Sequence, residues 1–74
     1  MVQKYYFQLA LPYQECLAYY HGQVKAVMVT SSTGQRVQFP ASHIRPYMTR
    51  VGVYGSFCLY TENNKFLSLE KLDK

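Results

Sequence analysis

Residues 4–11 read KYYFQLAL, and the side chains along this stretch alternate between two kinds. The larger apolar side chains occupy every second position, at Tyr5, Phe7, Leu9 and Leu11. Successive side chains of a β-strand point to opposite faces, so this alternation predicts a strand with one face on a hydrophobic core. Because a lone strand buries too little apolar surface to be stable, the rest of the chain has to supply its partners.

Four further stretches are typical of strands: residues 24–31, 36–39, 51–61 and 65–70. Turn-forming residues at 32–34 and 62–64 join them into two antiparallel hairpins. In the first hairpin we expect Val37 and Phe39 to point inward, and Arg36 and Gln38 to point outward.

Residues 12–21 have the pattern of a short helix. Pro12 suits the first helical position, and Gly22 suits the left-handed residue that ends a helix. The apolar side chains follow the i, i+3, i+4, i+7 spacing of a single stripe: Tyr13, Cys16, Leu17 and Tyr20. We expect this stripe to be buried on the sheet, because so short a helix is unstable alone. Residues 41–48 are expected to form a connection with room for one helical turn.

The sequence therefore predicts an α+β fold with the order β-α-β-β-β-β, in which residues 1–74 form one domain. Two arrangements fit this order. One is a small curved antiparallel sheet with the helix on one face, and the other is a partly closed barrel with the one short helix at its end. A chain of 74 residues buries only about 60% of its unfolded surface, and its aromatic content of 16% compensates for the small core.

Several classes of protein do not fit the sequence. No apolar stretch is long enough for a transmembrane helix, and no signal peptide is recognisable, so we expect a cytoplasmic protein with no membrane partner. Cys16 and Cys58 are expected to be reduced, partly buried thiols. No phosphate-binding loop, carboxylate pair or cluster of metal ligands occurs, so we expect no enzyme, no catalytic residue, no metal and no cofactor.

The excess of positive over negative charge lies in the middle of the chain. The net charge is +4, and residues 25–50 contain four basic and no acidic residues: Lys25, Arg36, Arg45 and Arg50. Guanidinium groups bind phosphate oxygens, and tyrosine rings stack on bases. One hypothesis is therefore a domain that binds single-stranded RNA or DNA through Arg36, Arg45, Arg50, Tyr47 and Tyr54.

The tyrosines support a second hypothesis. Tyr6, Tyr54 and Tyr60 fall on the polar side of their predicted strands. An aromatic patch open to water is typical of a surface that binds another protein or a second copy of the same chain. The alternative is that these rings cover a small core while their hydroxyls stay in water. Of the functional hypotheses, a non-enzymatic protein–protein interaction module requires the fewest specific features in the sequence.

Several short sequence motifs resemble those of a known family. In chain order they are KYYF at residues 4–7, RVQFPA at 36–41, RP at 45–46 and NNKFLSLE at 63–70. They are similar to domain-of-unknown-function family 2835, a family of short uncharacterised gammaproteobacterial proteins. The resemblance extends over nearly the whole chain. It implies a bacterial cytoplasmic protein of unknown function, and it assigns no role to any residue.

Overall fold

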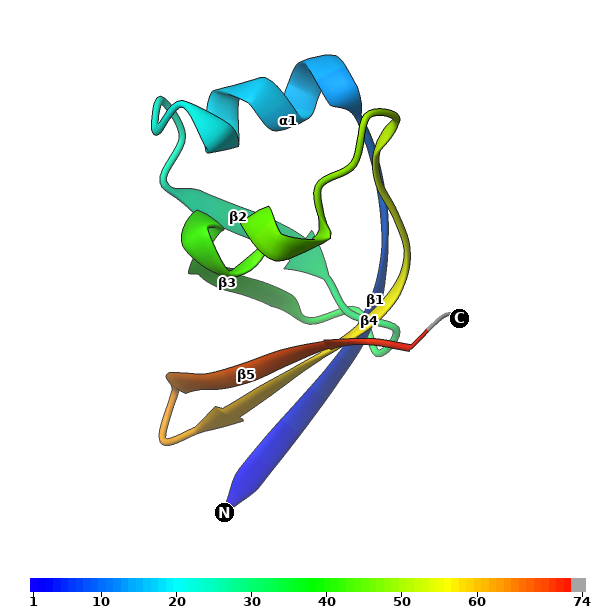
Figure 1. Cartoon of the computed structure of the whole chain (residues 1–74). Coiled ribbons are helices and arrows are strands. Elements are labelled where there is room, and N and C mark those ends of the chain that lie inside the picture. The colour runs from blue at the N-terminus through cyan, green and yellow to red at the C-terminus, as the bar shows by residue number, and fades with distance from the viewer. Residues whose placement is uncertain (73–74) are drawn as a thin grey trace.

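The computed structural model describes residues 1–72, and its element order confirms the predicted β-α-β-β-β-β chain (Figure 1). The elements are β1 (Val2–Pro12), α1 (Tyr13–Tyr20), β2 (Ala26–Thr30), β3 (Arg36–Pro40), β4 (Gly52–Glu62) and β5 (Lys65–Lys71). Two short 3-10 helices, η1 (Ala41–His43) and η2 (Arg45–Tyr47), occupy the connection between β3 and β4, where the sequence predicts room for one turn.

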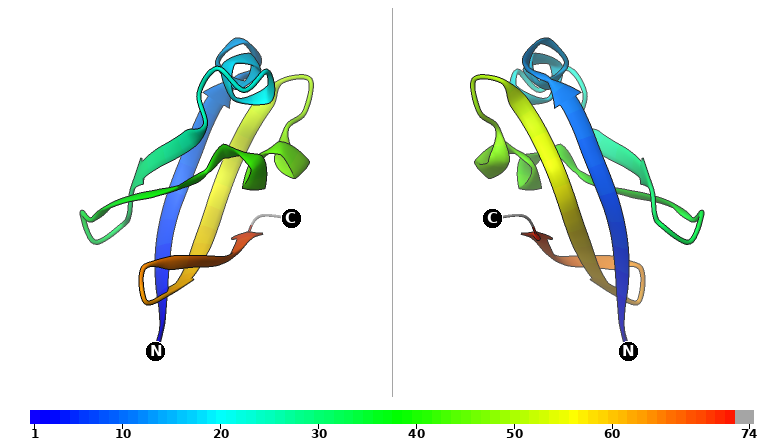
Figure 2. Two further views of the ribbon diagram at one scale, coloured as in Figure 1. Left: turned by 90° about the vertical axis from the view of Figure 1, so that its left-hand side faces the viewer. Right: turned by 90° about the vertical axis from the view of Figure 1, so that its right-hand side faces the viewer.

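The strands form two antiparallel sheets, and neither closes into a barrel. β1 and β4 pair along their whole length, from Val2↔Glu62 to Pro12↔Gly52, and β5 adds to the other side of β4. β2 and β3 form a separate hairpin. Figure 2 shows β1 and β4 side by side along the molecule, with α1 across their upper end. The Ser32 N–H donates a 2.7 Å hydrogen bond to the Tyr6 carbonyl, so the hairpin turn is tied to β1.

The core lies between the two sheets and contains the side chains that the strand alternation points inward. Phe7 of β1 lies 5.9 Å from Phe57 of β4 and 6.0 Å from Phe39 of β3, measured between ring centroids. Ile44, between η1 and η2, is fully buried beside them, as are several β-branched and leucine side chains: Val27, Val53 and Leu59. The predicted inward positions of the first strand and the first hairpin are confirmed.

The prediction of a fully buried helix stripe is wrong. Of its residues only Cys16 is buried, whereas the side chains of Tyr13 and Tyr20 are 48% and 61% exposed. α1 packs on β1, β4 and η1 through Cys16 and Tyr19, so it is rotated away from the predicted contact. A helix of two turns touches the end of a sandwich along a narrow line, and the rest of its apolar stripe stays open to solvent.

The connection between β3 and β4 covers the free edge of β5. The Tyr47 hydroxyl donates a 2.9 Å hydrogen bond to the Leu69 carbonyl. Leu72 N–H bonds toward β4, so by the alternation of a strand the Leu69 carbonyl faces the other way. His43 stacks on Phe66 with ring centroids 3.7 Å apart. Such contacts keep a strand edge from pairing with another chain.

Among the described residues, no helix has the length and apolar character needed to cross a membrane. Cys16 and Cys58 are both free and both buried.

Candidate functional site

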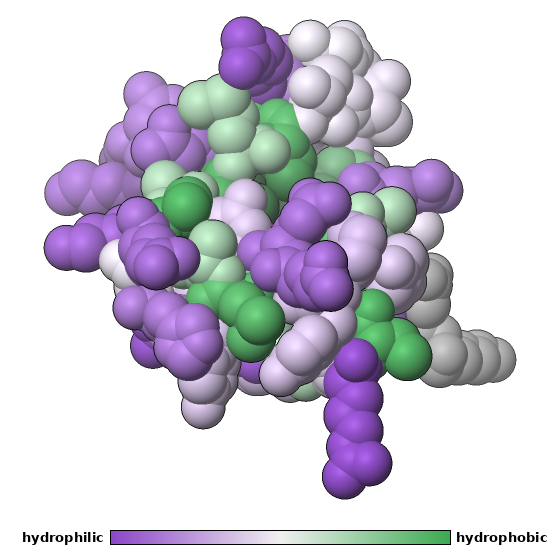
Figure 3. All heavy atoms as spheres, turned by 90° about the horizontal axis from the view of Figure 1, so that it is seen from above, coloured by the Kyte–Doolittle hydropathy of each residue, from purple (hydrophilic) through white to green (hydrophobic). Residues whose placement is uncertain are grey.

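A groove of about 460 Å³ lies between α1 and the segment 48–51. The helix side contributes Tyr13, Cys16, Leu17, Tyr20 and His21, and the opposite side contributes Met48, Thr49 and Arg50. We call it the α1 groove. Figure 3 looks down on this end of the molecule, where green apolar side chains are exposed between purple hydrophilic ones. Its volume is within the range of ligand pockets, roughly 300–1,000 Å³.

The wall opposite the helix is a tight, hydrogen-bonded turn. The backbone groups of Thr49 and Gly52 bond to each other in both directions, at 3.0 and 3.1 Å. The Thr49 hydroxyl also donates to the Gly52 carbonyl at 2.8 Å and accepts the Val51 N–H at 3.3 Å. These bonds fix the shape of the turn before any partner binds, so little conformational entropy is lost on binding.

Gly52 brings this turn against the start of the helix. Its φ is +117°, and a Cβ at this position would overlap the Leu11 carbonyl oxygen. The same Cβ would lie 2.9 Å from backbone atoms of Pro12 and Tyr13. Only glycine allows so close an approach with such a φ, so this residue sets the spacing between the two walls of the groove.

Cys16 forms the buried floor of the groove. Its Sγ lies 3.6 Å from the Leu11 carbonyl oxygen. Burial raises the pKa of the Cys16 thiol, and the nearby Glu15 carboxylate raises it further, against a lowering by a hydrogen bond with the Val53 backbone. The reactive form of cysteine is the thiolate, so this thiol serves as an apolar floor.

The three arginines of the basic segment are not brought together. Arg45 places Nη2 3.5 Å from the Tyr19 carbonyl oxygen at the end of α1, and Arg50 lines the α1 groove. Arg36 instead crosses the outer face of the hairpin, where Nη2 donates to the Met28 sulfur at 2.9 Å. Within residues 1–72, Arg45 and Arg50 have no carboxylate at ion-pair distance.

The two tyrosines of the nucleic-acid hypothesis lie in different surroundings. Tyr47 is half-buried, with its ring edge-on to Phe57 at 5.3 Å and its hydroxyl bonded to the backbone of β5. Tyr54 is exposed on β4, opposite Ala10. Tyr47 thus has a structural role, and Tyr54 does not line the α1 groove.

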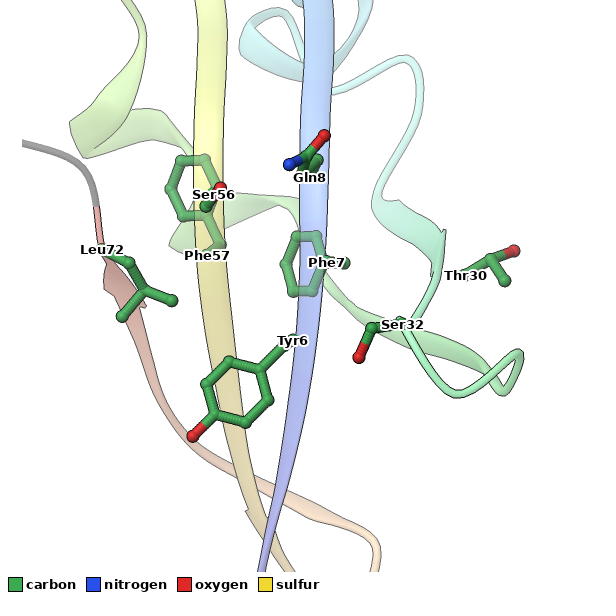
Figure 4. A pocket seen from close by; sticks show the side chains of 8 residues that line it. All are labelled: Tyr6, Phe7, Gln8, Thr30, Ser32, Ser56, Phe57 and Leu72. Atoms are coloured by element: carbon green, nitrogen blue, oxygen red, sulfur yellow. The ribbon is translucent and has the colours of Figure 1, made fainter.

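Tyr6, Tyr54 and Tyr60 share the face of the β1–β4–β5 sheet that points away from the core, as the alternation predicts. Tyr60 is half-buried: its hydroxyl donates to Glu70 at 2.8 Å, and Lys4 Nζ lies 5.8 Å from its ring centroid. Tyr6 remains exposed beside a hollow of about 380 Å³. Figure 4 shows side chains that line this hollow, among them Tyr6 of β1, Leu72 after β5 and Ser32 of the hairpin turn. This face is partly occupied by its own side-chain contacts.

In the part of the chain that the structure describes, no three His, Cys, Asp or Glu side chains gather in a way that could hold a metal ion.

The α1 groove is the feature that sequence reasoning missed. Its helix side was visible as the apolar stripe, but the pattern does not say whether such a stripe meets the core or solvent. Its other side depends on the approach of residues 48–51, for which the one local signal is Gly52 after a short run of polar and β-branched residues.

Comparison with known proteins gives one match. The model of a family described as protein of unknown function (DUF2835) matches residues 3–72, which is nearly the whole chain. This match confirms the family resemblance that the short sequence motifs indicate. No curated protein and no solved structure matches the chain. The comparisons therefore assign no activity to any residue.

Proposed function

We propose that this chain, which belongs to the DUF2835 family of proteins of unknown function, is a non-enzymatic protein–protein interaction module. The α1 groove is its docking site. The proposal depends on one observation. The apolar stripe of α1 lines a preformed groove and is largely exposed there, with only Cys16 buried.

The composition of the groove is that of an interface centre. Tyrosine, methionine and arginine are enriched at protein–protein interfaces, and the α1 groove combines Tyr13, Tyr20, Met48 and Arg50. Tyrosine adds much contact area for little loss of side-chain freedom. Val51, at the tip of the adjacent turn, extends the apolar surface with 69% of its side chain exposed.

Peptide display tests this proposal. A random peptide library is selected on the intact chain, and the amide NMR shifts of the chain are then followed with each enriched peptide. We expect the shifts to concentrate in residues 13–21 and 48–51. Tyr20→Ala should weaken binding by roughly 30-fold, which corresponds to the loss of about 2 kcal/mol at an interface hot spot.

Tyr54→Ala is the control, because it removes an exposed tyrosine from the outer face of the sheet, outside the residues that line the groove. It should leave the affinity unchanged, and thermal unfolding shows that both variants are folded. Peptides that bind both variants equally, or a library that yields no binder, would rule out the α1 groove as a docking site.

Single-stranded nucleic-acid binding is the second candidate function. Its support is narrower: Arg45 and Arg50 have no carboxylate partner within residues 1–72, but Arg36 and Tyr47 are engaged elsewhere. Its test is affinity for single-stranded RNA or DNA that falls steeply with salt. Affinity that persists after all three arginines become glutamine would refute the role of these residues.

The location that we propose is the cytoplasm, where the two free buried thiols stay reduced. Fractionation of cells that express the tagged chain tests it, and recovery in any other fraction would contradict it.

A further inference from the structure

We propose that the occupant of the α1 groove is an acidic segment of a partner protein, with an apolar or aromatic anchor flanked by Asp or Glu. This inference rests on the proposed function and adds the chemistry of the partner to it.

The anchor follows from the walls of the groove. Leu17 and Met48 are half-buried, and Tyr13 and Tyr20 expose about half of their side chains. An apolar side chain that enters between them removes apolar surface from water on both molecules, which is the main favourable contribution to association. With a volume of about 460 Å³, the groove suits a short segment better than a large flat surface.

The acidic flanks follow from the charges at the rim. Arg50 lines the groove and Arg45 lies at the end of α1, and neither has a carboxylate partner within residues 1–72. Of the residues that the structure describes, no acidic one lines the groove. Potentials across a protein interface tend to be complementary, so an unpaired guanidinium beside an aromatic wall favours a carboxylate in the partner.

The end of the helix does not oppose this choice. The carbonyl end of a helix carries partial negative charge and repels anions. Here three of these carbonyls are engaged: the N–H groups of His21 and Gln23 donate to the carbonyls of Leu17 and Ala18 at 2.9 Å each, and Arg45 donates to that of Tyr19. The negative end of α1 is thus covered on the side where Arg45 lies.

A second copy of this chain is a poorer occupant. Each copy carries a net charge of +4, so two copies repel each other. The acidic residue of α1, Glu15, does not line the groove, although its carboxylate is close enough to Cys16 to raise the pKa of that thiol. The Glu15 carboxylate therefore slightly weakens the binding of an acidic partner. Removing its charge should strengthen that binding, which is the opposite of the effect expected for Arg50→Gln.

Three synthetic peptides test the inference. They share one Trp-Leu anchor and differ only in their flanking residues, which are Glu, Gln or Lys. Fluorescence anisotropy with the intact chain should give affinities in the order Glu, Gln, Lys, with the difference shrinking as salt is raised. Arg50→Gln should weaken the Glu peptide by about 2- to 5-fold and the Gln peptide hardly at all.

Two further variants serve as controls. Arg36→Gln removes an arginine that lies on the outer face of the hairpin, and it should leave all three affinities unchanged. Glu15→Gln should strengthen the Glu peptide by less than about 5-fold.

The outcomes separate the inference from the function on which it rests. Equal affinities of the three peptides, a reversed order of affinities or no binding at all would refute the inference of an acidic partner. The docking function would still stand if display peptides of other composition bind in the groove. A single-stranded oligonucleotide that displaces the Glu peptide, and whose affinity falls with Arg36→Gln, would assign the basic residues to nucleic acid and overturn the inference.

Discussion

Replacing Gly52 with alanine should destabilise the domain more than the same change at Gly22 or Gly34. The φ of +117° is unfavourable for a residue with a Cβ, and the new Cβ would meet backbone atoms of β1 and α1 that cannot rotate away. Backbone strain of this kind costs about 1–3 kcal/mol. The steric overlap adds about 1–3 kcal/mol as in an overpacked core.

The sum, about 2–6 kcal/mol, is large for a chain of 74 residues. Such a domain has a total stability of roughly 4–11 kcal/mol, at about 0.05–0.15 kcal/mol per residue. In a domain of this size each kcal/mol lowers Tm by about 4–8 °C. We therefore expect Gly52→Ala to lower Tm by at least about 8 °C in calorimetry.

Gly34→Ala is the matched control. Gly34 also has a positive φ, +87°, but no atom lies within 4 Å of its added Cβ. Its cost should be the strain alone, about 1–2 kcal/mol. An equal loss of Tm in both variants would show that the close approach at Gly52 contributes nothing, and the argument for the spacing of the α1 groove would fail.

Three further predictions concern single interactions. Tyr47→Phe, which leaves the Leu69 carbonyl without its 2.9 Å partner, should cost about 0.5–1.5 kcal/mol in urea unfolding; no change would mean that water replaces the hydroxyl fully. The hydrogen bond to Glu70, together with the Cys58 side chain, raises the pKa of Tyr60, so Glu70→Gln should lower the alkaline midpoint of the Tyr60 ultraviolet signal, assigned with Tyr60→Phe. An unchanged midpoint would contradict the role of Glu70. Burial raises the pKa of Cys16 above its ordinary value of 9.0, so the stability from its neutral thiol is fully present below that pH and is lost as pH rises toward the folded-state pKa. The free energy of unfolding should fall more steeply in this alkaline range for the wild type than for Cys16→Ala, and parallel curves would refute it.

The strands were predictable because their signal is local. Each second residue from Tyr5 to Leu11 is large and apolar, and this is sufficient to identify the strand and its inner face. The hairpin between β2 and β3 also follows from local residues, since Ser32-Thr33-Gly34 can form a turn whatever the rest of the chain does.

The pairing of the strands was not predictable in the same way. β1 pairs with β4, so that Val2 lies opposite Glu62 and Pro12 opposite Gly52, and within residues 1–72 β3 pairs only with β2. The alternation of apolar and polar residues along a strand predicts which face is buried, but it does not predict which strand pairs with its edge. A single curved sheet, two sheets and a barrel share the same pattern, and the choice depends on packing of side chains such as Phe7 and Phe57.

The candidate site was predictable only in its parts. The apolar stripe of α1 and the basic residues Arg45 and Arg50 are visible in the sequence, but their meeting depends on how the helix is rotated on the sheet. That rotation is decided by Cys16 and Tyr19, which reach the core in place of Tyr13 and Tyr20. A helix with apolar residues on more than one side has more than one such solution.

The segment from η1 to η2 has a consequence for assembly into fibres. Amyloid grows when a strand from one molecule adds to the open edge of another. On the β5 side, an arriving strand meets the Tyr47 hydroxyl already on the Leu69 carbonyl and the His43 ring already on Phe66. Strand addition there requires residues 41–47 to detach first, and their detachment uncovers Ile44 from the core. The rate at which this side can seed a fibre is therefore limited by how often that segment opens.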